Sequence, residues 1–199
     1  ECELDNAKTD LAAVRDDLLQ AQVTGQQAQQ LALTDTLTGL PNRASFDQAL
    51  TQGLAQSKRQ GWGLAVMFID VDKFKNINDS HGHDVGDRVL LTVANRLNSF
   101  IRDGDMVSRW GGDEFVCLLL EVKHENDVLR LAGKLVQRVA EAVDLSGQTL
   151  HIKISIGIAL CPSDGDTAEL LIKHADKAMY KAKGTAQRVA LFRQLNTPD

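Results

Sequence analysis

The sequence has few cysteines, no long hydrophobic run and no block of basic residues, and each absence excludes a class of protein. Its three cysteines, Cys2, Cys117 and Cys161, are an odd number without CxxC spacing, which argues against a disulfide framework or a zinc site. The longest apolar run, Gly63 to Ile69, is far shorter than the roughly 20 residues that cross a bilayer. We therefore expect a soluble segment in the reducing cytoplasm, without direct membrane contact.

The charge balance also restricts the partners. The chain has 22 Lys and Arg against 27 Asp and Glu, a net charge of −5, so nucleic-acid or anionic-membrane binding is disfavoured. Its 199 residues, 43% of them hydrophobic and 25% charged, allow one globular domain, or one domain with an extension. Because the first residue is Glu and no signal-peptide pattern precedes it, we expect the chain to be part of a longer protein.

Residues 1–33 have the spacing of a coiled coil. Apolar or small residues recur at alternating three- and four-residue intervals at Leu4, Ala7, Leu11, Val14, Leu18 and Ala21. With Leu4 at heptad position a, a parallel partner would pair Glu3 with Lys8 and Asp10 with Arg15, which favours a parallel homodimer. An amphipathic helix packed on its own domain remains the alternative, because alanine at position d makes a weak zipper.

Residues 34–193 are predicted to form one domain, followed by a tail at 194–199. The turn-rich segment Thr34 to Arg43 ends the first helix. We expect helices at 44–60, 85–101, 125–143 and 167–183, and strands at 63–71, 106–110, 114–120, 151–160 and 188–192. This βαββαβ order with a trailing αβ pair predicts an α/β (α+β), ferredoxin-like sheet with flanking helices.

Two acidic clusters are expected at neighbouring strand ends. Asp70 lies at the C-terminal end of the first strand and Asp72 follows it, and Asp113 and Glu114 lie at the tip of the 106–120 hairpin. Converging carboxylates favour Mg²⁺, which commonly bridges carboxylates to substrate phosphates. The alternative is that Asp70 and Asp72 only solubilise a strand end and that Asp113 is a turn residue.

Other phosphate and metal sites do not fit the sequence. It contains no GxxxxGK[ST] run, and Gly61-Trp62-Gly63 precedes a strand instead of a helix, so neither a P-loop nor a Rossmann site is present. An EF-hand loop starting at Asp70 would require glycine where Lys75 stands and glutamate where His81 stands. His81 and His83 have no further spaced ligand, so a loop or substrate-contact role fits them better than metal binding.

The run Arg109-Trp110-Gly111-Gly112-Asp113-Glu114-Phe115 resembles the signature of the GGDEF family of diguanylate cyclases. Residues 35–43, 68–79, 154–159 and 175–183 are similar to other motifs of that family. The resemblance covers residues 33–192 and implies condensation of two GTP into cyclic di-GMP and two pyrophosphates, on a palm-like fold related to nucleotidyl cyclases. It also implies a homodimer, because each domain binds one GTP, and an upstream sensor domain.

The resemblance further implies a metal site and a catalytic group. Asp70, the carbonyl of Val71 and Asp113 would hold Mg²⁺, or Mn²⁺ in its place. Asp113 or Glu114 would accept the proton, and the choice between them stays open. Lys75 would supply positive charge to the phosphates.

The substrate-binding residues implied by the resemblance come from several segments. Gly111 and Gly112 would let the hairpin backbone lie close to the nucleotide, and Lys183 would contact its phosphates. The remaining ones are the backbone N–H groups of Lys73 and Phe74 for phosphate, and Asn78, Asp87 and His83 for guanine.

One departure from the family pattern concerns the phosphates. Where the family commonly has Gly-Arg-Asn, this chain reads Ala186-Gln187-Arg188. Either Arg188 reaches the phosphate from the neighbouring position or that contact is missing, which would weaken triphosphate binding.

Arg102-Asp103-Gly104-Asp105 resembles the family's RxxD inhibitory motif. Arg102 and Asp105 would bind cyclic di-GMP, with Arg130 and Lys134 completing the pocket; the alternative is a polar turn. A catalytically silent receptor for GTP or cyclic di-GMP is the rival function, but its usual hallmark, a degenerate signature, is absent. A cyclase with another product is disfavoured by the implied guanine-binding residues.

Overall fold

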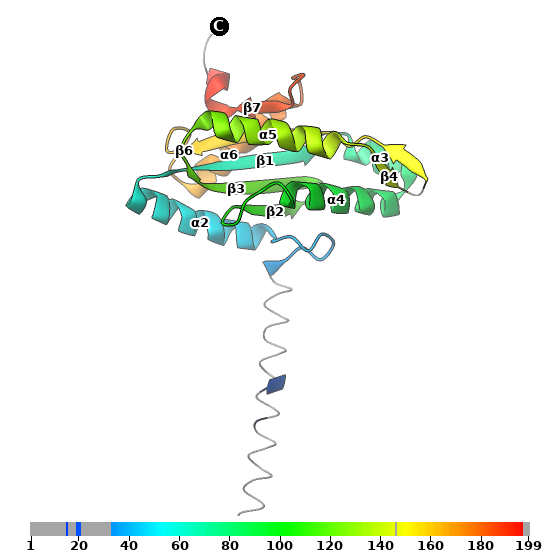
Figure 1. The fold of residues 1–199 in the computed structure, drawn as a ribbon, viewed down its shortest axis with the longest axis horizontal. Coiled ribbons are helices and arrows are strands. Elements are labelled where there is room, and N and C mark those ends of the chain that lie inside the picture. Colours follow the sequence, from blue (N-terminus) through cyan, green and yellow to red (C-terminus); the bar gives the residue numbers. More distant parts are fainter. Residues whose placement is uncertain (1–14, 16–18, 21–32, 146, 197–199) are drawn as a thin grey trace, which may run out of the picture.

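A five-stranded sheet flanked by helices forms the domain in the computed structural model, which describes residues 15, 19–20, 33–145 and 147–196 (Figure 1). The predicted coiled coil lies almost entirely outside these residues. The elements are α2 Arg43–Gln60, β1 Gly63–Val71, α3 Phe74–His81, α4 His83–Asn98, β2 Met106–Gly111, β3 Glu114–Val122, α5 Glu125–Ala140, β4 Val143–Leu145, β5 Gln148–Leu150, β6 Ile154–Cys161, α6 Ala168–Ala182, β7 Val189–Leu191 and the 3₁₀ helix η1 Phe192–Asn196.

The strand order is β2-β3-β1-β6-β7. The central strand β1 pairs antiparallel with both β3 and β6, and β7 adds a parallel edge strand to β6. Strands β2, β3, β1 and β6 thus have the arrangement of a βαββαβ ferredoxin-like sheet, which confirms the predicted topology.

Both faces of β1 are buried, as its continuous apolar run suggested. Ala65, Met67 and Ile69 pack in the core under α4 and α5, and Leu64 and Phe68 pack in the core under α2 and α6. Because side chains alternate across a strand, Asp70 continues the second set, so the strand delivers its carboxylate to the α2 and α6 side.

Gly157 in β6 brings α6 close to the sheet. A Cβ at this glycine would lie 2.0 Å from the backbone nitrogen of Met179 and 2.1 Å from the carbonyl oxygen of Ala175. Only glycine permits such an approach of helix to strand. The close packing carries Lys183, directly after α6, to the end of β1.

Three segments differ from the sequence prediction. The Asn- and Asp-rich stretch after β1, expected as a loop, contains the two-turn helix α3, which is too short for a clear periodic signal. Helix α5 ends at Ala140 instead of residue 143. At this end the Arg96 guanidinium donates to the carbonyls of Val139 and Glu141, both at 2.7 Å. The β4–β5 hairpin then occupies residues that were expected to be the helix end and a loop.

Candidate active site

The two acidic clusters meet at one end of the central strands. Asp70 and Glu114 are directly paired positions of β1 and β3, and paired side chains of antiparallel strands lie on the same face. The backbone N–H of Val71 donates to the carbonyl of Asp113 at 3.1 Å, which holds the hairpin tip beside the end of β1. The predicted convergence of the two clusters is therefore confirmed.

Negative charge is concentrated at this end of the sheet. Burial raises the pKa of Asp70, and the charges of Asp113 and Asp72 add to the rise, while the Lys183 ammonium, 2.8 Å from Asp70 Oδ1, opposes it. Burial also raises the pKa of Glu114, followed by the charges of Asp70, Asp113 and Asp176. The site thus favours a cation or a proton among its carboxylates.

Oxygen atoms at this end of the sheet would fit Mg²⁺ as ligands. Among the described residues, no three His, Cys, Asp or Glu side chains are grouped to hold a metal ion. Asp70, Asp113 and the carbonyl of Val71 instead offer two carboxylates and one carbonyl, and Mg²⁺ takes one or two carboxylates and keeps several waters. The mutual repulsion of the carboxylates supports this fit.

The tip of the signature hairpin is open. Gly111 and Gly112 have φ of 155° and 55°, and no atom lies within 4 Å of where a Cβ would stand at either residue. These backbone angles and the empty space leave room for the close approach of a nucleotide that the resemblance implies.

Arg109 attaches this hairpin to the start of the domain, a connection that sequence reasoning missed. Its guanidinium donates to both carboxylate oxygens of Asp35 at 3.0 and 3.1 Å, and to the carbonyl of Gly112 at 3.0 and 2.7 Å. Asp35 also accepts hydrogen bonds from the backbone and hydroxyl of Thr38. The only sequence signal was the presence of opposite charges in two separate motifs.

The predicted guanine-binding residues lie on the neighbouring helices α3 and α4. Asn78 packs against Gly86, where a Cβ would be 1.8 Å from Asn78 Oδ1. This oxygen is buried and has no hydrogen-bond partner among the described residues, so it is an unsatisfied acceptor. His83 and Asp87 are exposed on α4.

The predicted phosphate-binding residues surround the β1–α3 turn. Lys73 precedes α3 with a φ of 56°, and its side chain, like that of Lys75, is exposed. Phe74 begins α3 and is half-buried. Lys183 is the one cation of this group that contacts a carboxylate of the site.

The family profile described as "Diguanylate cyclase, GGDEF domain" matches residues 32–188. The chain belongs to the GGDEF diguanylate cyclase family. In Pseudomonas aeruginosa, the cyclic di-GMP phosphodiesterase NbdA is 43% identical over 163 residues, and these are 82% of this chain and 21% of that protein. The diguanylate cyclase TpbB is 42% identical over 165 residues, 82% of this chain and 38% of TpbB. The chain thus spans only a minor part of these relatives.

Solved GGDEF structures have the same fold. The GGDEF domain of TpbB is 41% identical with a TM-score of 0.77, over 82% of this chain and 99% of that one. The coiled coil and GGDEF domain of DgcB from Caulobacter crescentus, in complex with cyclic di-GMP, is 25% identical with a TM-score of 0.85, over 92% of this chain and 98% of that one. The sheet and its helices are therefore the palm-like cyclase fold of the GGDEF family.

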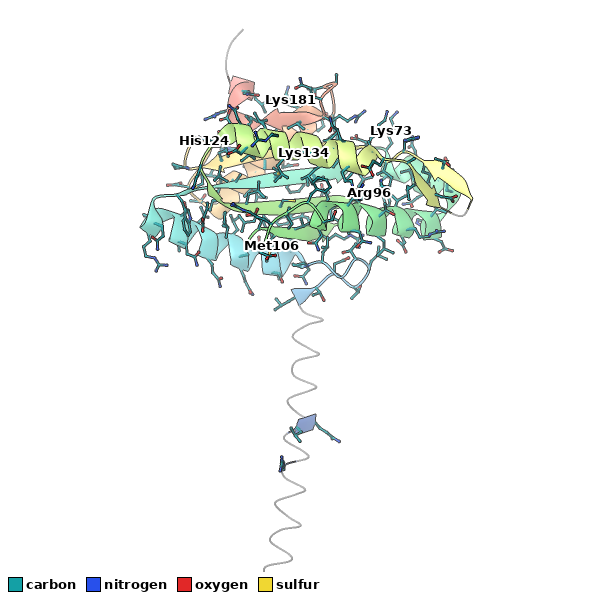
Figure 2. The ribbon with its side chains drawn as sticks, viewed as in Figure 1. Lys73, Arg96, Met106, His124, Lys134 and Lys181 are labelled. Carbon is teal, nitrogen blue, oxygen red and sulfur yellow. The ribbon has the colours of Figure 1, made fainter. Side chains whose placement is uncertain are left out.

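The four residues that resemble the GGDEF family's RxxD motif form a compact turn. Arg102 Nε lies 3.2 Å from Asp105 Oδ2, and the guanidinium also donates to the carbonyl of Leu120 at 2.6 Å. Both residues line a cavity of about 430 Å³. Neither Arg130 nor Lys134, both on α5, is among the residues that line it. Arg130 pairs with Asp127, which does line the cavity, and Lys134 lies farther along the helix (Figure 2).

In the described part of the chain, no helix has the length and apolar character needed to span a bilayer.

Proposed function

We propose that this chain is the catalytic domain of a Mg²⁺-dependent diguanylate cyclase that condenses two GTP into cyclic di-GMP and two pyrophosphates. The observation that carries the proposal is the convergence of Asp70, Asp113 and Glu114 beside an open hairpin tip with an intact signature. A receptor without activity is less well supported, because it would not need this grouping of carboxylates.

The proposed chemistry uses the chain's own groups in separate roles. Asp70, Asp113 and the carbonyl of Val71 would hold Mg²⁺, which when bound neutralises phosphate charge and polarises the α-phosphorus. The 3′ oxygen of one GTP bonds to the α-phosphorus of the other, the bond to pyrophosphate breaks, and the 3′ proton passes to a carboxylate. Glu114 suits this step because its raised pKa is closer to neutrality, with Asp113 as the second candidate.

The nucleotide is bound through its base and its phosphates. The unpartnered Oδ1 of Asn78 accepts from the guanine amino group, and the carboxylate of Asp87 accepts from the N1–H and the amino group. Lys183, Lys75 and the first N–H groups of α3 face the phosphates.

Two domains are needed for each product, because each binds one GTP. The heptads of residues 1–33 would bring two copies together, with their active sites facing each other and an upstream sensor controlling the arrangement. The free thiols of Cys117 and Cys161 are compatible with the reducing cytoplasm, where we place the reaction.

Product inhibition is the regulatory part of the proposal. Arg102 and Asp105 would bind cyclic di-GMP at the turn before β2, separate from the carboxylates, with Arg130, the ion-pair partner of Asp127, as a further contact. Arg102→Ala should then remove inhibition by cyclic di-GMP while leaving the initial rate unchanged. If cyclic di-GMP inhibits this variant as strongly as the wild type, Arg102 is only a turn residue.

The direct test is incubation with GTP and Mg²⁺, followed by chromatography of the products. We expect cyclic di-GMP and pyrophosphate from the wild type, none from Asp113→Ala or Asp70→Asn, and undiminished synthesis from Asp166→Asn, which changes an exposed carboxylate elsewhere. GTP binding without turnover in the wild type would favour the silent receptor instead.

A further inference from the structure

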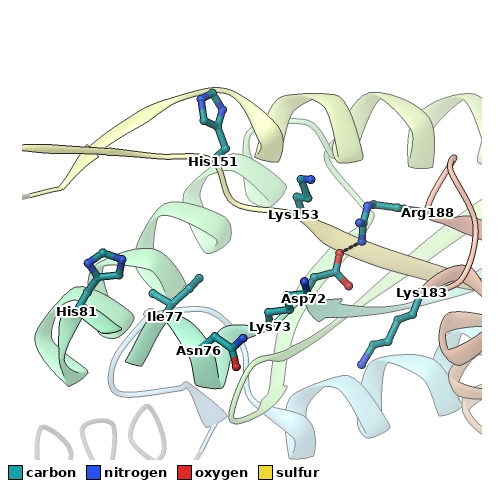
Figure 3. A pocket seen from close by; sticks show the side chains of 9 residues that line it. All are labelled: Asp72, Lys73, Asn76, Ile77, His81, His151, Lys153, Lys183 and Arg188. Carbon is teal, nitrogen blue, oxygen red and sulfur yellow. Dashed lines mark hydrogen bonds and ion pairs between the residues drawn. The ribbon is translucent and has the colours of Figure 1, made fainter. Parts of the chain in front are cut away.

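A basic cavity of about 600 Å³ lies beside the candidate active site (Figure 3). Lys73 contributes from the start of α3, Lys153 from the segment before β6, and Lys183 and Arg188 from the region between α6 and β7. Asp72 is the one carboxylate among its lining residues. Lys183 also contacts Asp70, so the cavity adjoins the carboxylate cluster.

The cavity has an excess of positive charge. Its four cationic side chains face one carboxylate. Lys73 and Lys153 are exposed and form no ion pair with any described residue, so their charges are available to a ligand. A concave wall with an excess of positive charge attracts a multiply charged anion.

Arg188 is held in position at the wall of this cavity. Asp72 accepts from the Arg188 guanidinium and from the Ser155 hydroxyl, the latter at 2.8 Å. The backbone is fixed as well, because the N–H of Ile156 donates to the carbonyl of Arg188 at 2.8 Å. A guanidinium has five N–H donors, so those not used by Asp72 can bind a phosphate oxygen.

Backbone donors border the same space. Helix α3 has eight residues, and its N-cap Lys73 makes no side-chain capping bond. The first N–H groups of a helix have no partner within the helix and favour phosphate. By contrast, Gln187, where the GGDEF family commonly has arginine, is exposed and is not among the residues that line the cavity.

We propose that Lys153 and Arg188 form the subsite for the β- and γ-phosphates of GTP and for the departing pyrophosphate, in place of the arginine that this chain lacks at Gln187. The inference rests on the proposed function and names two residues of this chain that bind the phosphates in that reaction. Both contact phosphates that the leaving group carries away, so they act on triphosphate and pyrophosphate but not on the nucleoside.

The test is calorimetric titration of the full chain with inorganic pyrophosphate, GTP and GMP in the presence of Mg²⁺. Lys153→Ala and Arg188→Ala should each weaken pyrophosphate and GTP binding about tenfold, the effect of one lost charge-assisted contact, and leave GMP binding unchanged. Arg59→Ala, which removes an exposed arginine at the end of α2, is the matched control and should bind all three ligands as the wild type does.

Unchanged pyrophosphate affinity in either variant overturns the proposal. Lys153 is exposed and its side chain forms no ion pair within the described part of the chain, so its truncation should leave the fold intact, and circular dichroism checks this. An equal loss of GMP affinity would also overturn it, because GMP lacks both phosphates. The binding measurements do not depend on turnover. If the variants bind pyrophosphate more weakly but the wild type makes no cyclic di-GMP, the proposed function alone is refuted. If the wild type makes cyclic di-GMP but the variants bind pyrophosphate as tightly as it does, the subsite alone is refuted.

Discussion

Removal of Arg109 should separate the signature hairpin from the turn that begins the domain. Its guanidinium makes two hydrogen bonds to Asp35 and two to the carbonyl of Gly112. The side chains of Arg109 and Asp35 are only 13% and 22% exposed. In Arg109→Ala, Asp35 keeps its Thr38 hydrogen bonds but loses its countercharge in a partly buried place.

The expected destabilisation is about 3 kcal/mol. Breaking a fully buried pair costs about 3–5 kcal/mol and an exposed pair less than about 1 kcal/mol; the low exposure of this pair and its four hydrogen bonds place it near the lower end of the buried range. For a chain of this size that corresponds to a melting temperature lower by about 6–12 °C. Cyclic di-GMP synthesis should fall as well, because the carbonyl of Gly112 is no longer held.

A double-mutant cycle with Asp35→Ala, followed by urea unfolding, measures the coupling directly. We expect a coupling of about 1.5 kcal/mol or more, since hydrogen bonds to charged groups fall in this range. The Arg130–Asp127 pair, with side chains 69% and 53% exposed, is the control and should couple by less than about 1 kcal/mol. A coupling between Arg109 and Asp35 no larger than that of the control would refute the reasoning.

The same pair predicts a pH dependence. Burial acts to raise the pKa of Asp35, but hydrogen bonds from Thr38 and Arg109 and the charge of Arg109 outweigh it, so the pKa lies below its ordinary value of 3.8. The stability that this carboxylate contributes is therefore present above pH 3.8 and is lost as the pH falls through the lower folded value. Unfolding midpoints measured from neutral to acid pH should fall less steeply in Arg109→Ala.

Four further predictions follow from single side chains. Asn78→Ala should reduce the preference for GTP over ATP about tenfold or more in calorimetry; an unchanged preference would remove this residue from the guanine site. Glu114→Gln should raise the melting temperature at neutral pH, because the raised pKa of this acid means that its charged form opposes folding as the pH rises above 4.5; a lower melting temperature would contradict this. Gly157→Ala should destabilise the domain by more than about 3 kcal/mol, since its Cβ meets the Met179 backbone at 2.0 Å, and urea unfolding that matches the wild type would disprove the close contact. Burial raises the pKa of Cys117 to about 12, so this thiol should be alkylated only after the protein unfolds, as measured by mass spectrometry.

Local sequence patterns determined much of this protein. The apolar run of β1 predicted a strand buried on both faces, and the order of strands and helices predicted the ferredoxin-like sheet. Asp70 and Asp113 could be assigned to neighbouring strand ends because Asp70 lies at the end of an apolar strand and Asp113 in a hairpin turn. These features depend on residues close together in the chain, where periodicity and turn chemistry act.

Only the tertiary structure decided which distant charges meet. Arg109 and Asp35 are 74 positions apart, and Arg188 and Asp72 are 116 apart. Whether such residues pair depends on the register of β2 with β3 and of β6 with β1 and β7, and on the close approach of α6 at Gly157. The sequence did not predict helix α3 for a related reason. Its two turns carry too little periodic signal, and it packs against α4, a contact that no local pattern encodes.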